Sequence, residues 1–561
     1  MRKRSPIVVV SFLLITALAA LGAEDGIENN IPAEAPGVVI IEKPYRQFRR
    51  FLGSDVFARL TDPETVPAVA HGVENVRRVI QAVETQHGTD AGLVMGGIFR
   101  REAALVALPG DRGVLISRGE NAHVLRSEVK EFLRVERATG NLLSTETFSH
   151  RGVTINTCSL GNQPEPRHHA LVGDRLVLSE DLEAVKQVID VTKGEAPSLA
   201  ESVDFKHAMG QVEEGAILTA YLSAGAVANA IDRKAGATDA GGRTVLRRVR
   251  EAVGRARYAV LWAKSDAVIE GRLTVQYGEQ GIPPLLRTTV AEPGTDLSAP
   301  RFVPGNAAFT LARSLNPAAC WREIVGFLQE VNPPAAQKAE RGLRKLVQLI
   351  GGVDSADQLF SELGNEVALF VLSGADAQNP PRVGLVLALN ETAHIPVALE
   401  TFVGTAAVFA AVEGKADVSL VHAEVGGVRV TTVRVRKPSP WDRLSPSMAV
   451  VRGHLVVTST RDAMREVIAA AGSRPEKLAG VSGTSYALIQ LDATRIEAML
   501  QRHNEFLVRR AVEEDGKPEP QARRELRMLR LVLSLMEEIE VINSYSPDRT
   551  EHAFRITFPE E

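Results

Sequence analysis

Short runs in which apolar and polar residues alternate recur along this chain. In the stretch 431–436 (TTVRVR), valine alternates with arginine from Val433 on, as expected of a strand with one buried face. Strands are predicted likewise at 103–108, 113–117, 142–148, 153–160, 170–178, 217–222, 258–263 and 268–276. Helices are predicted at 63–86, 121–136, 179–191, 243–255, 320–331, 335–350, 501–512 and 522–539. Short turns such as Pro109-Gly110 join several strands, so most of the sheet is expected to be antiparallel.

The second feature is an internal repeat. Residues 102–110 (EAALVALPG) reappear at 366–374 as EVALFVLSG. Further blocks match in the same order, namely 120–124 with 391–395, 172–189 with 451–468, 222–224 with 491–493, and 272–275 with 555–558. Because the period is far longer than the roughly 20–50 residues of a solenoid repeat, the pattern indicates a duplicated domain.

Together these patterns predict an α+β fold. Two homologous copies of a mostly antiparallel, curved sheet are expected, each with helices packed on one face. The predicted boundaries are a signal peptide at 1–23, a tail or linker at 24–44, the first repeat at 45–280, a proline-rich connector at 281–305 and the second repeat at 306–561.

The N-terminus has the pattern of a secretory signal. Arg2-Lys3-Arg4 precedes an apolar run that ends in the small residues around Ala23. That run is shorter than the ~20 residues that a membrane-spanning helix needs, so cleavage is favoured over a membrane anchor. No cysteine stands at the expected cut and no later segment reaches spanning length. The mature chain is therefore expected in the periplasm or outside the cell.

Composition narrows the choice of partners and leaves the cysteines undecided. A net charge of −4 does not indicate the basic surface that nucleic-acid binding requires, and an aromatic content of 5% does not favour an aromatic cage for a ligand.

Cys158 and Cys320 fall at non-equivalent places in the two copies. They are either buried apolar side chains or a disulfide between the copies.

Two pairs of equivalent polar residues are candidates for a ligand groove. His123 and His394 each follow a strand and stand in the first turn of a predicted helix, where an exposed helix N-terminus is the alternative explanation. Glu102 and Glu366 are equivalent carboxylates, which a strand-edge charge that prevents aggregation would explain equally well.

Other motif searches point to no chemistry. His168-His169 lies on a predicted strand, where neighbours face opposite sides and cannot readily share one metal ion. The basic segments 243–257 and 523–530 are either membrane-binding helices or solvated faces, and the second explanation is favoured. No nucleophile elbow, phosphate-binding loop or dinucleotide fingerprint is found. No catalytic residue, cofactor or metal ligand is predicted.

One stretch resembles a known family. Residues 171–179, which contain Gly173-Asp174, are followed by Glu183-Ala184, by Ser198-Leu199-Ala200 and by Phe205. This pattern resembles a domain-of-unknown-function family of exported bacterial proteins. The second copy matches it more weakly, since Gly453-His454 replaces the Gly-Asp pair. The resemblance implies no activity.

The duplication, the predicted export and the lack of a catalytic motif favour a non-enzymatic cell-envelope protein. It is expected to bind a hydrophobic or peptide-like partner, such as a small ligand or another envelope protein, in a groove between its copies, or to act as a scaffold. The alternative is a periplasmic hydrolase whose site forms only in three dimensions. A serine, a histidine and a carboxylate within hydrogen-bond reach would favour that alternative. A third hypothesis is an oligomerisation surface.

Overall fold

The computed structural model describes residues 26–559, except 53–95, 111, 139, 141, 162–164, 236–239, 266–267, 289–296, 351–355, 374–380, 391–399, 401–417, 436–444 and 472–484. The predicted signal peptide, the predicted helix at 63–86 and His394 lie outside the described residues. The chain divides into two compact units. Unit 1 comprises residues 1–233 and 256–278, and unit 2 comprises 234–255 and 279–561.

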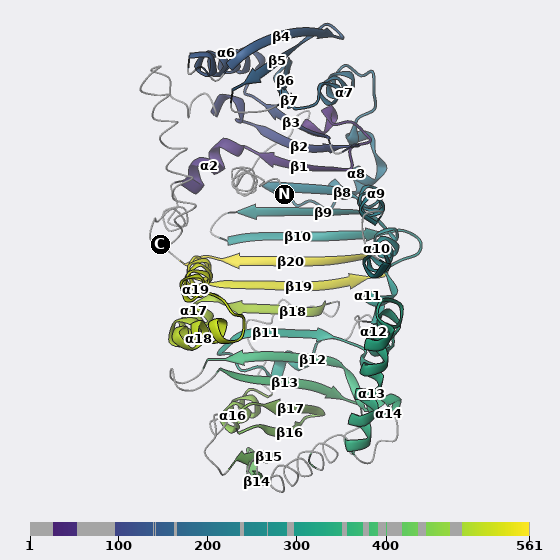
Figure 1. Ribbon diagram of the computed structural model, residues 1–561, viewed down its shortest axis with the longest axis vertical. Coiled ribbons are helices and arrows are strands. Elements are labelled where there is room, and N and C mark those ends of the chain that lie inside the picture. The colour runs from purple at the N-terminus through teal and green to yellow at the C-terminus, as the bar shows by residue number, and fades with distance from the viewer. Residues whose placement is uncertain are drawn as a thin grey trace. The chain divides into compact units, whose positions relative to one another are not determined.

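Unit 1 is built on an open antiparallel sheet (Figure 1). Its described strands are β1 (Gly37–Glu42), β2 (Glu102–Leu108), β3 (Arg112–Arg118), β4 (Leu142–His150), β5 (Val153–Leu160), β6 (Arg167–Val172), β7 (Arg175–Ser179), β8 (Leu218–Ser223), β9 (Ala256–Ser265) and β10 (Val268–Tyr277). Hydrogen-bonded neighbours follow the order β4-β5-β6-β7-β3-β2-β1-β8-β9-β10.

Unit 2 has a sheet of the same design. Its described strands are β11 (Ala307–Ser314), β12 (Leu363–Leu372), β13 (Arg382–Leu389), β14 (Val418–Val425), β15 (Val428–Val435), β16 (Ser447–Val451), β17 (His454–Thr458), β18 (Ser485–Asp492), β19 (Glu538–Ser546) and β20 (Arg549–Thr557). Their order is β14-β15-β16-β17-β13-β12-β11-β18-β19-β20, again antiparallel throughout. The order of unit 1 therefore recurs strand for strand.

Helices complete each unit. In unit 1 the described helices are η1 (Ile27–Asn30), α2 (Pro44–Leu52), α6 (Ala122–Ala138), α7 (Leu182–Thr192), η2 (Leu199–Glu201), α8 (Val203–Met209) and α9 (Ala224–Ala235). In unit 2 they are α10 (Ala240–Val253), α11 (Pro284–Thr288), η3 (Ala299–Phe302), α12 (Pro317–Val331), α13 (Pro333–Ile350), α14 (Ala356–Glu362), α16 (Arg461–Ala470), α17 (Ala493–Arg502), α18 (Asn504–Glu513) and α19 (Glu519–Ser534). The predicted cap Asn121 accepts hydrogen bonds from the first turn of α6, and Asp492 caps α17.

Each sheet has one face closed by a continuous core, which we call the covered face. In unit 1, residues of η1, α7 and α8, such as Ile27, Val188 and Phe205, join alternate strand residues such as Val106 and Val177. In unit 2, η3 and α16 take the same places and pack on residues of β12, β13 and β17. Period-two burial along the strands follows directly, because successive side chains point to opposite faces.

Helices also reach the opposite face, which we call the open face, so the predicted packing on one face alone is incomplete. Leu125 of α6 packs with Leu176, whereas the next residue, Val177, points into the core of the covered face. Val347 of α13 and Leu359 of α14 pack similarly with Leu455 in unit 2. An apolar stripe shows that a helix must bury one side, but it does not say which face of the sheet receives it.

Two segments expected to be linkers belong to the fold. Gly37–Glu42, predicted within a tail at 24–44, forms the interior strand β1 between β2 and β8. Ala299 and Phe302, predicted within the connector at 281–305, are buried in the core of unit 2. Prolines and glycines around both segments resemble linker composition, and only the pairing partners far along the chain turn them into structure.

Some predicted elements are divided differently. The strand expected at 170–178 is two strands, β6 and β7, with Gly173 in a left-handed turn at φ 63°. Asp181 rather than Ser179 caps α7. The helix expected at 522–539 ends at Ser534, and β19 begins at Glu538.

Two further expectations concern the membrane and the cysteines. Among the helices described, none is both long and apolar enough to cross a membrane. Cys158 is buried, Cys320 is half-buried, and both thiols are free.

Candidate functional site

The open face of unit 1 carries a row of half-buried apolar side chains. Cross-strand pairing links them one to the next through seven neighbouring strands: Leu178, Leu115, Leu105, Val39, Ala220, Leu261 and Leu273. We call this set the unit 1 row. The solvated face of an antiparallel sheet normally carries polar residues, so an apolar row on this face of the described strands is a candidate surface for an apolar partner.

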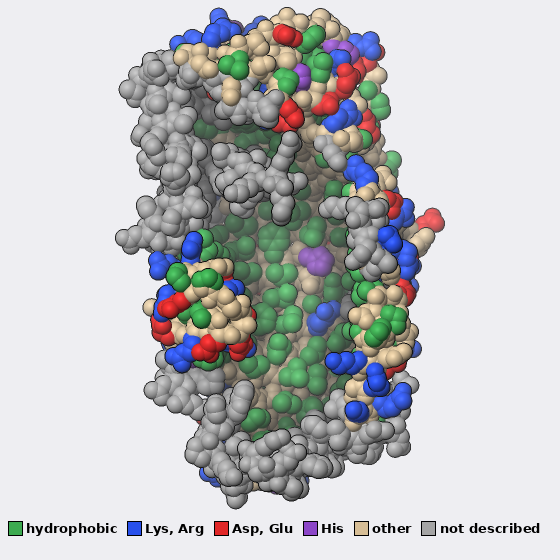
Figure 2. Space-filling view, in the orientation of Figure 1, with side chains coloured by type: hydrophobic (Ala, Val, Ile, Leu, Met, Phe, Trp, Pro, Cys, Tyr) green, Lys and Arg blue, Asp and Glu red, His purple; other side chains and the backbone are tan. Residues whose placement is uncertain are grey.

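Unit 2 has an apolar row at the corresponding strands. Its members are Val457, Leu385, Leu369, Leu311, Ile489, Val541 and Phe554, all half-buried. Figure 2 views this face of the strands and shows hydrophobic side chains gathered over them. A polar pair stands beside this row, where Nδ1 of His552 lies 2.7 Å from Oδ1 of Asn543 and burial lowers the pKa of the imidazole.

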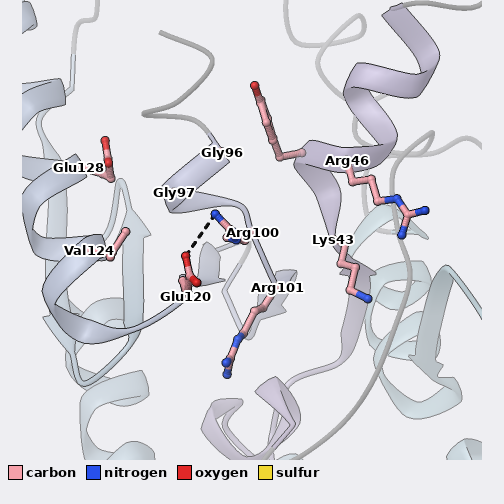
Figure 3. A pocket seen from close by; sticks show the side chains of 10 residues that line it. Lys43, Arg46, Gly96, Gly97, Arg100, Arg101, Glu120, Val124 and Glu128 are labelled. Carbon is pink, nitrogen blue, oxygen red and sulfur yellow. Dashed lines mark ion pairs between the residues drawn. The ribbon is translucent and has the colours of Figure 1, made fainter. Parts of the chain in front are cut away.

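A basic pocket of about 590 Å³ lies in unit 1. Its lining comes from three segments: the link from β1 into α2, the residues just before β2, and the start of α6 (Figure 3). The lining residues are Lys43, Tyr45, Arg46, Gly96, Gly97, Arg100, Arg101, Glu120, Val124 and Glu128. We call this cavity the basic pocket.

The charges of the basic pocket do not balance. Arg100 lies 3.2 Å from Glu120, and the dashed line in Figure 3 marks that ion pair. Among the described residues, the side chains of Lys43, Arg46 and Arg101 have no acidic partner within ion-pair distance. Glu128 is the remaining carboxylate, and burial together with repulsion from Glu131 raises its pKa. The pocket therefore carries an excess of positive charge.

Backbone contacts hold the walls of the basic pocket together. The N–H of Lys43 donates to the Arg101 carbonyl at 2.5 Å, and Lys43 itself adopts the left-handed region at φ 44°, which is unusual for a residue with a side chain. A Cβ on Gly97 would come within 2.5 Å of Cγ of Glu128, so glycine permits the close approach of α6 at that point.

Glu102, a predicted groove residue, lies in a buried ionic network on the covered face. Arg118 Nη1 is 3.5 Å from the Glu102 carboxylate, and Arg118 Nε donates to Asp174 at 2.9 Å. Burial, followed by repulsion from Glu42 and Glu28, raises the pKa of Glu102 to about 7 against the lowering effect of Arg118. Glu102 stands on an interior strand and is 5% exposed, so a strand-edge charge is not its role.

Glu366, the equivalent carboxylate, binds the first turn of η3. Its Oε2 accepts the N–H of Ser298 at 2.6 Å, the N–H of Ala299 at 2.9 Å and the Ser298 hydroxyl at 2.8 Å. Nε2 of His454 lies 2.9 Å from the same hydroxyl, and Nδ1 of His454 is 3.1 Å from the Arg452 carbonyl. A serine, a histidine and a carboxylate are thus within hydrogen-bond reach.

The order of these bonds differs from that of a catalytic triad. In a triad the histidine lies between the serine and the carboxylate, whereas here the Ser298 hydroxyl lies between Glu366 and His454. The hydroxyl has one proton to donate, to Glu366 or to Nε2 of His454, and the tautomer of His454 decides whether Nε2 donates or accepts. The cluster therefore ties η3 to β12 and β17 in this arrangement.

The remaining predicted residues have ordinary surroundings. His123 is exposed in the first turn of α6, and its N–H donates to Oδ1 of Asn121. His168 Nδ1 lies 2.8 Å from Oγ1 of Thr157, while burial lowers the pKa of His169 to about 4. Within the described part of the chain, no group of three or more histidine, cysteine, aspartate or glutamate side chains could hold a metal ion.

The basic segments are largely ion-paired on the helix surfaces. Arg247 of α10 lies 2.6 Å from Glu251 and 2.8 Å from Glu330. Arg523 of α19 lies 2.8 Å from Glu505 and 2.9 Å from Glu519. Such pairing suits a solvated face, since arginines committed to carboxylates are less available to lipid phosphates.

Sequence reasoning missed the basic pocket because its residues are far apart along the chain. Lys43 and Arg46 stand more than fifty positions before Arg100 and Arg101. A local signal existed, because Lys43 directly follows β1 and Arg101 directly precedes β2. These two strands pair with Glu42 opposite Glu102. Only that pairing places the two groups beside each other.

The comparisons with known proteins concern one stretch of the chain, most of which lies in unit 1. Residues 126–242 match the model of a family described as "Protein of unknown function (DUF3352)". The match contains residues 171–205, on which the sequence resemblance rests. No curated protein and no solved structure matches the chain.

Proposed function

We propose that this chain is a non-enzymatic, exported cell-envelope protein that binds a hydrophobic ligand on the open faces of its two units. The observation that carries the proposal is the presence of an apolar row at the same strands of both units. Half-exposed leucines in contiguous rows are costly in water, at about 25 cal/mol per Å² of apolar surface, and become favourable when a ligand covers them.

The repeated strand order supports an origin of the two units by duplication. The sequence blocks at 102–110 and 366–374 fall on β2 and β12, and those at 172–189 and 451–468 run through β6–β7–α7 and β16–β17–α16. Ser223 and Asp492 are the last residues of the matching strands β8 and β18, and α9 and α17 begin at the next residue. A duplication would provide each unit with its own ligand surface.

Export is proposed from the N-terminal pattern of Arg2-Lys3-Arg4, the apolar run and the small residues up to Ala23. N-terminal sequencing of the protein from its own cells, with separation of periplasm and medium, tests it. We expect a mature chain that begins near Glu24 outside the cytoplasm. A full-length chain in the cytoplasm would contradict export without bearing on ligand binding.

Native mass spectrometry of the protein purified from its own envelope tests the ligand. We expect a mass excess that denaturation removes, and extraction should yield an apolar small molecule. A peptide in the extract would replace the hydrophobic ligand by a peptide-like partner. A bare chain, or a multiple of it, would favour a scaffold or an oligomerisation surface.

Binding of single-chain fatty acids of increasing length locates the surface. Affinity should rise with each added CH₂ by up to ~0.8 kcal/mol, a factor of about four. Leu105→Glu in unit 1 and Leu369→Glu in unit 2 place a charge in the centre of each row and should together abolish this dependence. Val249→Glu is the matched control, because Val249 is 45% exposed on α10 and belongs to neither row. Equal binding by all variants would contradict the proposal.

The Ser298–His454–Glu366 cluster favours the alternative of a periplasmic hydrolase, because it brings the three side chains of such a site together. A fluorophosphonate probe tests it directly. Covalent labelling of the wild-type protein at Ser298, lost in Ser298→Ala, would establish a nucleophile. A protein that stays unlabelled under conditions that label a control serine hydrolase supports the non-enzymatic function.

A further inference from the structure

The basic pocket and the unit 1 row are neighbours on the same side of the sheet. Oγ of Ser117 donates to the Ile98 carbonyl at 2.5 Å, so the segment that lines the pocket with Gly96 and Gly97 rests on Ser117. Ser117 pairs with Ala103 and Leu176, and two residues earlier on β3 stands Leu115 of the unit 1 row. Two residues along a strand span about 7 Å.

A pocket with excess positive charge beside an apolar surface matches an amphiphile in both parts. We propose that the basic pocket binds the phosphate or carboxylate headgroup of a single-chain amphiphile whose hydrocarbon chain lies along the unit 1 row. This inference rests on the proposed function, because the row must accept an apolar chain for the headgroup to have a reason to enter the pocket. It adds the chemical class of the ligand and the strands, β1 to β3, beside which its headgroup is held.

The cations suited to this role are Lys43, Arg46 and Arg101. They line one cavity, and among the described residues no carboxylate neutralises their side chains. Arg100 is partly committed to Glu120 at 3.2 Å. An arginine fork can bind a phosphate or carboxylate through two parallel hydrogen bonds, and a lysine adds a point charge.

Unit 2 provides an internal contrast. At the positions of Arg100 and Arg101, which directly precede Glu102, unit 2 has Gly364 and Asn365 directly before Glu366. The basic residues of the pocket come from the β1–α2 link and from the turn before β2. In unit 2, β11 ends at Ser314, and Leu315 and Asn316 lead into α12 without a basic residue. The headgroup site is therefore assigned to unit 1 alone.

The test compares two lipids that share one acyl chain, lysophosphatidic acid and the neutral monoacylglycerol, titrated below their micelle concentrations into the full-length mature protein. The pocket variant carries Lys43→Gln, Arg46→Gln and Arg101→Gln, which remove three charges and keep much of the side-chain length. The control variant carries Lys338→Gln, Arg344→Gln and Lys345→Gln, which remove three exposed charges from α13. Circular dichroism and thermal unfolding check that each variant is folded.

We expect the wild-type protein and the control variant to bind the anionic lipid at least about tenfold more tightly than the neutral lipid. The pocket variant should lose this preference and keep its affinity for the neutral lipid. As a second measure that needs no variant, the preference should fall as salt rises, since partly exposed charges are screened.

Every other result of these titrations would contradict a specific part of the proposal. Equal affinity of the wild-type protein for both lipids overturns the headgroup site and leaves the apolar row as the ligand surface. Glycerol phosphate or inorganic phosphate that binds as tightly as the anionic lipid overturns the amphiphile, because the pocket would then hold a free phosphate. Binding of neither lipid overturns the proposed function together with this inference.

Discussion

Unit 1 and unit 2 have the same strand order, yet they hold the matching carboxylates Glu102 and Glu366 by different means. Glu102 is buried with a guanidinium, and Arg118 is shared with Asp174. Glu366 receives backbone N–H groups and a hydroxyl from the start of η3. A buried carboxylate needs donors, but the fold does not prescribe whether they are side chains or main chain.

Register explains why the partners differ. In unit 1, Arg118 of β3 lies opposite Glu102 and opposite Arg175 of β7. In unit 2, Ala388 of β13 pairs with His454 of β17, so no guanidinium is available there. The donors come instead from η3, a segment that sequence composition assigns to a linker. The comparison shows that loss of one charged side chain can be offset by a neighbouring turn.

Arg118→Met should have the largest effect. It leaves the buried carboxylate of Glu102 without its guanidinium partner, which typically costs about 3–5 kcal/mol, whereas the half-buried Asp174 keeps its ion pair with Arg175. Hydrogen exchange measured on peptides from β2 and β3 at pH 7 should report the loss in unit 1, with unit 2 peptides unchanged. Arg126→Met, on the exposed side of α6, is the control. A loss below about 1 kcal/mol would mean that the network does not hold unit 1 together.

Glu102→Gln should remove a pH dependence that is specific to unit 1. The folded pKa is raised from 4.5 to about 7, so the folded state binds the proton more tightly than the unfolded state. The contribution of Glu102 to the free energy of unfolding is therefore largest below pH 4.5, and it is lost as the pH rises to 7. The total change is roughly 3 kcal/mol at 1.36 kcal/mol per pKa unit.

The measurement is urea unfolding of wild type and Glu102→Gln at steps between pH 4.5 and 8. The difference between them should shift in favour of the variant as the pH rises. His169 acts in the opposite sense, because its folded pKa of about 4 lies below its ordinary 6.5, so its contribution is lost as the pH falls through that window. It is present in both proteins and cancels in the difference, and a flat difference would contradict the raised pKa of Glu102.

Glu366→Gln should destabilise unit 2 by a smaller amount. In the variant, a neutral amide replaces the carboxylate that accepts hydrogen bonds from two backbone N–H groups. Hydrogen bonds to charged groups contribute about 1.5–3 kcal/mol to stability. Exchange of amides at 299–303 should accelerate most. Glu519→Gln, on the exposed first turn of α19, serves as the control. An unchanged exchange rate in η3 would mean that other contacts hold this turn.

The smallest expected effects concern the caps of the matching helices α7 and α16. Asp181 accepts the N–H of Ala184, and Thr460 accepts the N–H of Ala463. Asp181→Ala and Thr460→Ala should each cost about 1 kcal/mol of unfolding free energy in their own unit. Similar values from denaturant unfolding would show that the two helices are held alike. If the two substitutions differ by well over 1 kcal/mol in their cost, the two units hold their matching helices differently.

Local patterns predicted many of the elements and few of their partners. The strands near 103–108 and 113–117 and the helix after Asn121 are confirmed, because alternation, a turn and a cap are local signals. The interior strand β1 was expected in a tail, since its two neighbours come from positions 102–108 and 218–223. Glu102 and Glu366 were noticed through the repeat, but Ser298, His454 and the basic pocket were not, because they meet only across strands.

The sequence by itself determined the antiparallel, mixed α and β character of the chain and the positions at which its blocks repeat, since periodicity and identity are properties of the chain alone. Only the tertiary structure decided that Glu102 is buried with Arg118, that Glu366 binds η3, and that Lys43 and Arg101 line one cavity. Pairing of strands distant in the chain determines which side chains are neighbours, and a carboxylate's charge and partners depend on those neighbours. The open face is apolar for the same reason, as cross-strand register joins isolated leucines into a row.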